Sequence, residues 1–98
     1  TLQARGEKIL VVDDVQAQRD IARQMLSRLG YEVETVSSGE EAVAFLQERD
    51  ADILLLDMIM PPGMNGLETY REILEFKPDQ KAIIASGYAD IKNVRAAQ

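Results

Sequence analysis

The chain has 98 residues, of which 46% are hydrophobic, and this length and composition fit one folded domain with a packed core. The net charge of −6 argues against nucleic acid as a direct partner, because phosphate contacts need clustered Lys and Arg, and no apolar run approaches the ~20 residues of a membrane span. The absence of Cys and His excludes disulfides, thiolate metal sites, Ser-His-Asp chemistry and a typical zinc site.

The first quarter of the chain predicts a leader, a strand and a helix. Residues 1–7 are polar and are interpreted as a leader or linker, so that the domain spans residues 8–98. The apolar run 8–12 is typical of a strand buried on both faces. A helix is predicted over 15–29 and is expected to end at Gly30. Its apolar face consists of Ile21, Ala22, Met25, Leu26 and Leu29.

The middle of the chain predicts two strands around a second helix. Residues 31–36 alternate apolar and acidic side chains, a pattern that is typical of a half-covered edge strand. Ser38 and Glu41 have the spacing of a capping box, which opens a helix that ends near residues 48–50. The run 53–56 is the most hydrophobic and predicts a central strand.

Proline and glycine residues mark the loops in the rest of the chain. Residues 58–66 are expected to form a loop, and a third helix follows and ends before Pro78. Residues 81–85 predict a fourth strand. Asp90 could cap a short helix after it.

Strands and helices thus alternate, which predicts an α/β domain with a parallel sheet covered by helices on both faces. In such sheets the functional site lies beyond the carboxyl ends of the strands. Asp13 and Asp14 follow the first strand, Asp57 ends the third, and Ser86 follows the fourth. These four side chains are therefore expected to share one crevice.

Three carboxylates at one sheet edge repel one another. A pair about 4 Å apart at an effective dielectric near 20 repels by roughly 4 kcal/mol, which predicts a bound cation, a raised pKa, or both. A carboxylate cluster is suited to binding a hard cation such as Mg²⁺ or Ca²⁺. Two simpler interpretations stay open: Asp13 or Asp14 caps the first helix, and Asp57 is an ordinary strand-end residue.

At this point the pattern resembles the receiver domain of bacterial response regulators, from about Lys8 to the end. The resemblance implies a flavodoxin-like, doubly wound parallel sheet with strand order 2-1-3-4. It is carried by Leu10-Val11-Val12-Asp13-Asp14, Asp57 after Leu54-Leu55-Leu56, Met60-Pro61…Met64-Asn65-Gly66, and Ser86 after Ile83-Ile84-Ala85.

The resemblance also implies roles. Asp57 would accept a phosphoryl group from a phosphohistidine on a sensor histidine kinase or a histidine phosphotransfer domain. Asp14, Asp57 and the backbone carbonyl of Ile59 would bind Mg²⁺ directly, and Asp13 would hold the ion through water. Ser86 would hydrogen-bond the new phosphoryl group. The expected setting is cytoplasmic two-component signalling, with no nucleic-acid or membrane contact by this domain.

Two departures from the family pattern stand out. Family members have a fifth strand, with a Lys at its end, and a fifth helix, whereas this sequence stops at Gln98 and is expected to be incomplete at its C-terminus. The loop after Asp57 is one residue longer than usual, because Pro62-Gly63 stands where one residue is common. Similar loops occur in receivers attached to hybrid sensor histidine kinases, which favours that setting.

Two other functions compete with the phosphoacceptor. A receiver-like module that keeps the fold without switching is favoured by the absent Lys and opposed by the intact acidic trio. A Mg²⁺-dependent aspartyl phosphatase usually needs a second acid two residues after its nucleophile, and Ile59 occupies that position. The domain is therefore expected to be a signalling module and no enzyme.

The apolar side chain of Ile59 generates a prediction. In the family this position lies near the path of the hydrolytic water, so an apolar residue should hinder that water. We expect Ile59→Asn to shorten the lifetime of the phosphorylated form, measured as the dephosphorylation rate after removal of the phosphoryl donor. An unchanged rate would contradict the expectation.

Overall fold

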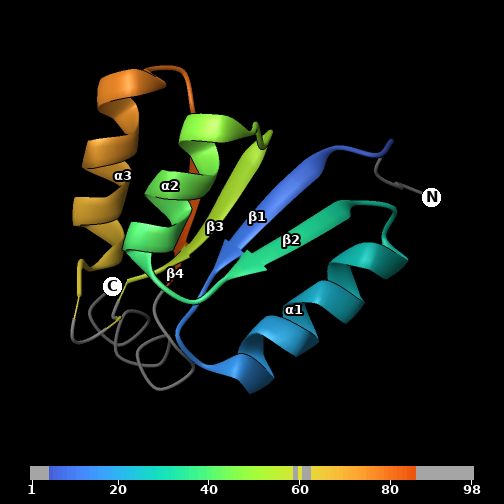
Figure 1. The fold of residues 1–98 in the computed structure, drawn as a ribbon. Coiled ribbons are helices and arrows are strands. Elements are labelled where there is room, and N and C mark those ends of the chain that lie inside the picture. Colours follow the sequence, from blue (N-terminus) through green and yellow to red (C-terminus); the bar gives the residue numbers. More distant parts are fainter. Residues whose placement is uncertain (1–4, 59, 61–62, 86–98) are drawn as a thin grey trace, which may run out of the picture.

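A computed structural model of the chain describes residues 5–58, 60 and 63–85 (Figure 1). The predicted alternation of strands and helices is confirmed over these residues, while the helix expected after Asp90 lies outside them. The elements are β1 (Lys8–Val12), α1 (Gln16–Arg28), β2 (Glu32–Val36), α2 (Gly39–Glu48), β3 (Ile53–Asp57), α3 (Gly66–Phe76) and β4 (Lys81–Ala85). None of the helices within the described ranges is long and apolar enough to cross a membrane.

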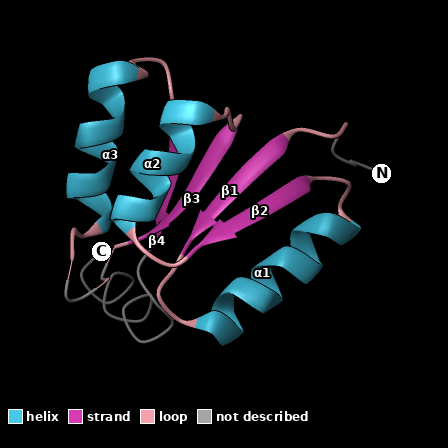
Figure 2. Cartoon of the chain, in the orientation of Figure 1, coloured by secondary structure: helices cyan, strands magenta, loops and turns pink. Residues whose placement is uncertain are grey.

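The four strands form one parallel sheet in the order β2-β1-β3-β4, as predicted (Figure 2). The alternating strand β2 lies at an edge and the most apolar strand, β3, lies inside, which confirms both expectations. The register pairs Val12 with Val36 on one side and with Leu56 on the other. The carboxyl ends of β1, β2 and β3 therefore lie level with one another.

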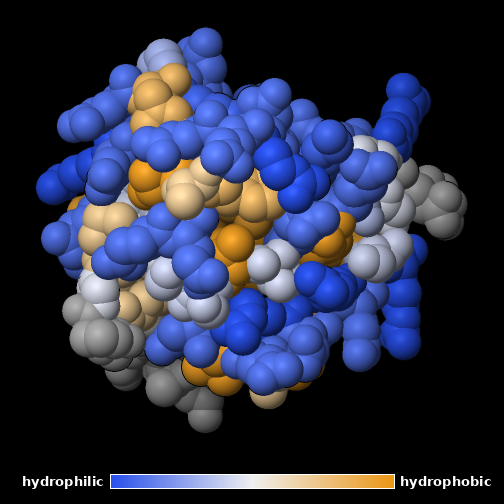
Figure 3. All heavy atoms as spheres, in the orientation of Figure 1, coloured by the Kyte–Doolittle hydropathy of each residue, from blue (hydrophilic) through white to orange (hydrophobic). Residues whose placement is uncertain are grey.

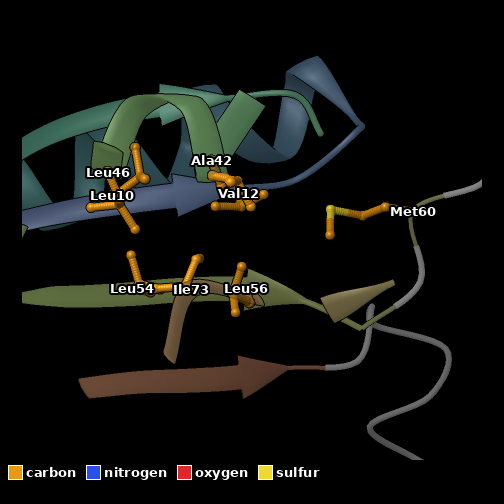
Figure 4. Packing of buried hydrophobic residues seen from close by; sticks show 9 residues of the cluster. Leu10, Val12, Ala42, Leu46, Leu54, Leu56, Met60 and Ile73 are labelled. Carbon is orange, nitrogen blue, oxygen red and sulfur yellow. The ribbon is translucent and has the colours of Figure 1, made fainter. Parts of the chain in front are cut away.

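The helices cover the two faces of the sheet unequally. Figure 1 shows α2 and α3 together on one face and α1 on the other. The main core lies between the sheet and the α2–α3 pair, and in Figure 4 the side chain of Met60 points from its loop toward this cluster. The buried residues of the cluster are Leu10, Val12, Ala42, Val43, Leu46, Leu54, Leu56, Met60 and Ile73.

The predicted apolar face of α1 is only half covered. Ala22 and Leu26 are half-buried, whereas Ile21, Met25 and Leu29 are 46%, 59% and 48% exposed. Because α1 is the one helix among the described residues on its face of the sheet, no neighbour covers the outer side of its apolar stripe. On the side of the molecule seen in Figure 3, hydrophilic side chains dominate and apolar atoms show in separate patches between them.

Two helix starts differ from the sequence expectation. The Ser38 hydroxyl accepts a hydrogen bond from the Glu41 amide at 3.1 Å, but the Glu41 carboxylate turns to the amide and hydroxyl of Ser37 instead of closing the box on Ser38. The reciprocal capping box occurs in α3, between Asn65 and Glu68. The Asn-x-x-Glu spacing signals this box, since Asn is a favoured N-cap.

A close approach between α2 and α3 fixes the layer above the sheet. A Cβ added to Gly39 would lie 2.0 Å from the Oγ1 atom of Thr69. Thr69 is fully buried and its hydroxyl donates to the Asn65 carbonyl at 2.8 Å, so it has little freedom to move. Glycine is therefore required at position 39 for steric reasons.

We expect Gly39→Ala to lower the free energy of unfolding by about 1–3 kcal/mol, because overpacking displaces fixed neighbours. Urea unfolding followed by circular dichroism measures it. Exposed Ala44 in the same helix offers a matched control, since Ala44→Ser should change the midpoint far less. Adding Thr69→Ala to Gly39→Ala should recover part of the loss, and a strictly additive double variant would contradict the steric explanation.

Candidate functional site

Three carboxylates converge at the carboxyl ends of β1 and β3. Val12 pairs with Leu56, and Asp13 and Asp57 are the next residues along the chain. These two residues therefore lie at the same level. Carboxylate oxygen atoms of Asp13, Asp14 and Asp57 all lie within 4.8 Å of one another. The structure thus brings together three of the residues singled out in the sequence. Ser86 and Ile59 lie outside the described residues.

The spacing of these oxygens suits a small hard cation. Ligand atoms around an octahedral Mg²⁺, at bond lengths of about 2.1 Å, lie roughly 3 to 4.2 Å from one another. The three carboxylate oxygens, which lie within 4.8 Å of one another, could reach this spacing by small side-chain movements or through one bridging water. The donor set is all oxygen and carries up to three negative charges, which is the chemistry that Mg²⁺ prefers. Asp14 is exposed and Asp13 and Asp57 are half-buried, so the cluster is open to solvent on one side.

The first of these residues is held in place by local contacts. The Asp13 amide donates to the Val36 carbonyl at 3.2 Å, and its carboxylate accepts from the Val15 amide at 2.9 Å. The N-cap of α1 is Val15, and no side chain caps this helix. The interpretation of Asp13 or Asp14 as a helix cap is therefore wrong, because the two residues precede the N-cap by two positions and one position.

Burial and a neighbouring charge both act on the titration of Asp13. Burial raises the pKa of the Asp13 carboxyl, and the neighbouring Asp14 charge raises it further. The hydrogen bond from the Val15 amide and the nearby Arg19 guanidinium oppose this increase in the pKa. The folded state therefore disfavours the ionised form of Asp13.

Arg19 also contacts the site, although no motif in the sequence marks it. Its Nη1 atom donates to the backbone carbonyl of Asp13 at 2.7 Å, and its side chain is half-buried. It thus ties the first turns of α1 to the end of β1 and places a positive charge near the carboxylates. The only sequence signal is a cation one turn into the helix that follows the acidic pair.

The loop after Asp57 closes tightly on itself. The Gly66 amide donates to the Met58 carbonyl at 3.0 Å, and the Met58 amide donates to the Ala85 carbonyl at 2.8 Å. A Cβ added to Gly66 would lie 2.5 Å from the Asp57 carbonyl oxygen. The start of α3 therefore lies directly against the strand end that carries Asp57, and only glycine allows this approach.

The raised pKa predicts that Asp13 weakens the metal-free fold. With the folded-state pKa above the unfolded value, ionised Asp13 lowers stability at every pH above both values, and the effect vanishes below the unfolded pKa. We expect Asp13→Asn to stabilise the chain at pH 7, by on the order of 1 kcal/mol because solvent screens a half-exposed group.

Urea unfolding in EDTA at pH 7 and pH 3 measures this effect. The gain should be present at pH 7 and absent at pH 3, whereas Asp79→Asn, at an exposed turn, serves as the charge-matched control. If Asp13→Asn is no more stable than the wild type at pH 7, ionised Asp13 does not lower the free energy of unfolding.

Comparison with known proteins gives a matching family and several sequence relatives. The family model of the response regulator receiver domain matches residues 9–98. The chain is 35% identical to the chemotaxis protein CheY of Thermotoga maritima over 82 residues, which cover 83% of this chain and 68% of CheY. It is 41% identical to the transcriptional regulatory protein ResD of Bacillus subtilis over 75 residues, 76% of this chain but 31% of ResD.

Solved structures give the same result. The response regulator TrrA of Thermotoga maritima, in complex with Mg²⁺-BeF, has a TM-score of 0.79 at 37% identity and covers 89% of this chain, which spans 75% of it. TrrA in complex with the histidine kinase ThkA has a TM-score of 0.78 at 39% identity, with 84% of this chain and 70% of TrrA covered. With strand order, acidic cluster and relatives in agreement, the chain belongs to the response regulator receiver domains.

Proposed function

We propose that this domain is a phosphoacceptor of a two-component phosphorelay and that Asp57 receives the phosphoryl group. The observation that carries the proposal is the convergence of Asp13, Asp14 and Asp57 at one edge of the sheet. A structural scaffold has no need of three carboxylates within 4.8 Å of one another, because they repel. A site for a cation and a transferred phosphoryl group uses all three.

The transfer itself needs little from the protein besides position and charge. A carboxylate oxygen of Asp57 attacks the phosphorus atom of a phosphohistidine on the partner. The bond between phosphorus and the imidazole nitrogen breaks, the nitrogen keeps the electron pair, and the imidazole takes up a proton. The product is an acyl phosphate on Asp57 and a neutral histidine on the partner.

Asp14, Asp57 and the Ile59 carbonyl would hold Mg²⁺, with Asp13 reaching it through water. When bound, the ion supplies positive charge to the phosphoryl oxygens. Arg19 and the Val15 amide keep Asp13 oriented toward the cluster. Ser86 would donate its hydroxyl to the phosphoryl group. Ile59 and Ser86 lie outside the described residues, so their roles rest on the family pattern.

The proposed partner is a sensor histidine kinase or a histidine phosphotransfer domain, in the cytoplasm. The complex of TrrA with ThkA supports this choice, since it joins a relative of this domain to a kinase. Phosphorylation would shift an equilibrium between two conformations and alter a surface that another domain or protein binds. The domain itself would turn over no substrate beyond its own phosphoryl group.

The test is intact mass after incubation of the chain with acetyl phosphate, with and without Mg²⁺. We expect a gain of one phosphoryl group that requires Mg²⁺ and is absent in Asp57→Asn. Asp52→Asn is the matched control, because Asp52 is an exposed residue at the opposite end of β3, and it should gain the group as the wild type does.

Each outcome selects one function. No gain in a chain with intact circular dichroism would favour the non-switching interaction module. A gain that persists in Asp57→Asn would place the acceptor elsewhere. Continuous turnover of an aryl phosphate would revive the phosphatase, which the apolar residue two positions after Asp57 disfavours.

A further inference from the structure

The loop between β3 and α3 is fixed at a second place, away from its base. The carboxylate of Glu40, in the first turn of α2, accepts a hydrogen bond from the Met64 amide at 3.3 Å. These residues are 24 positions apart in the sequence. The bond therefore links α2 to the loop that follows Asp57.

Glycine at position 63 leaves room for the Glu40 carboxylate. A Cβ added there would lie 2.6 Å and 2.7 Å from the two carboxylate oxygens of Glu40, so the carboxylate rests directly on the backbone of Gly63. Gly63 has no positive φ, so the close approach, and not the backbone conformation, favours glycine. Gly63 also belongs to the Pro62-Gly63 pair that makes this loop one residue longer than the common family spacing.

We propose that Glu40 is a positioning residue, which latches the extended loop to α2 and so fixes the backbone after Asp57 for cation binding and phosphoryl transfer. The inference rests on the proposed function of Asp57. The latch consists of the Glu40 carboxylate, the Met64 amide and the Gly63 backbone. A loop with one extra residue has more conformations to lose on ordering, and an added contact offsets that loss.

The latch completes a set of three anchors. At the base, the Gly66 amide donates to the Met58 carbonyl, and Gly66 lies against the Asp57 carbonyl. In the middle, the side chain of Met60 is buried in the core cluster (Figure 4). The latch at Met64 is the third anchor, and it is polar. Without it, the segment between Met60 and Gly66 keeps the apolar contacts of Met60 and Met64 with the core but loses its hydrogen bond to α2.

The experiment compares three variants of the 98-residue chain. Glu40→Ala removes the acceptor, whereas Glu40→Gln removes the charge but keeps an oxygen that accepts from the Met64 amide. Glu48→Ala is the matched control, because Glu48 is an exposed glutamate at the other end of α2. Four quantities are measured: exchange of the Met64 amide hydrogen, the Mg²⁺ dissociation constant by calorimetry, the initial rate of phosphorylation by acetyl phosphate, and the urea midpoint.

We expect Glu40→Ala to speed exchange at Met64, weaken Mg²⁺ binding and slow phosphorylation, each by about two- to ten-fold, which is the range for one hydrogen bond. Its urea midpoint should stay close to that of Glu48→Ala. Glu40→Gln should retain most of the wild-type behaviour. The effect on the site would then exceed the effect on the fold, which a purely structural contact would not produce.

Gly63→Ala provides an independent test. The added Cβ should push the Glu40 carboxylate off the loop and reproduce the effects of Glu40→Ala. In the double variant the collision is gone, so Gly63→Ala should cause no further loss beyond Glu40→Ala. This non-additivity is the signature of direct contact.

The outcomes separate the latch from the acceptor. If the wild type gains no phosphoryl group, the proposed function fails, while Met64 exchange and Mg²⁺ affinity still decide the latch. Equal values in Glu40→Ala, Glu48→Ala and the wild type would overturn the latch. Loss of Mg²⁺ affinity to the same degree in Glu40→Gln and Glu40→Ala would assign the effect to charge and would also overturn it.

Discussion

The pairing of β1 with β3 is the constraint on which the site depends. The register that buries Leu10 and Val12 beside Leu54 and Leu56 also brings Asp13 and Asp57 level with each other. Full burial of each large aliphatic side chain contributes roughly 1.5–3 kcal/mol, whereas two solvent-facing carboxylates about 4 Å apart repel by roughly 1–4 kcal/mol. Four buried side chains in this register outweigh that repulsion, so the core can hold like charges together.

Hydrogen bonds hold the backbone at both strand ends that carry the carboxylates. Arg19 and the Val15 amide hold Asp13 from the side of α1. On the side of β3, Gly66 and Met58 close the loop against the strand. The backbone on both sides of the carboxylate cluster is therefore held in place by hydrogen bonds.

The two faces of the sheet differ in how well their apolar side chains are buried. The α2–α3 face contains the buried cluster and the tight contact between Gly39 and Thr69. On the α1 face, Ile21 and Met25 remain about half exposed, and so does Ile83 of β4 at 59%. Both the latch at Glu40 and the base of the Asp57 loop lie on the α2–α3 face. This well-packed layer can therefore position a site that is open to solvent on one side.

Position at the ends of apolar runs was enough to single out Asp13, Asp14 and Asp57, because strand ends in a parallel sheet share one edge whatever the details of packing. The order of elements, the edge position of β2 and the inner position of β3 also followed from hydrophobic patterning. Ser86 and the Ile59 carbonyl remain predictions. By contrast, the contacts of Arg19 and Glu40 depend on where long side chains reach across a turn or from a helix to a loop. Tertiary structure likewise decided three features: the reciprocal capping box at Asn65, the incomplete capping box at Ser38 and the half-covered apolar stripe of α1. Each depends on which neighbour packs there.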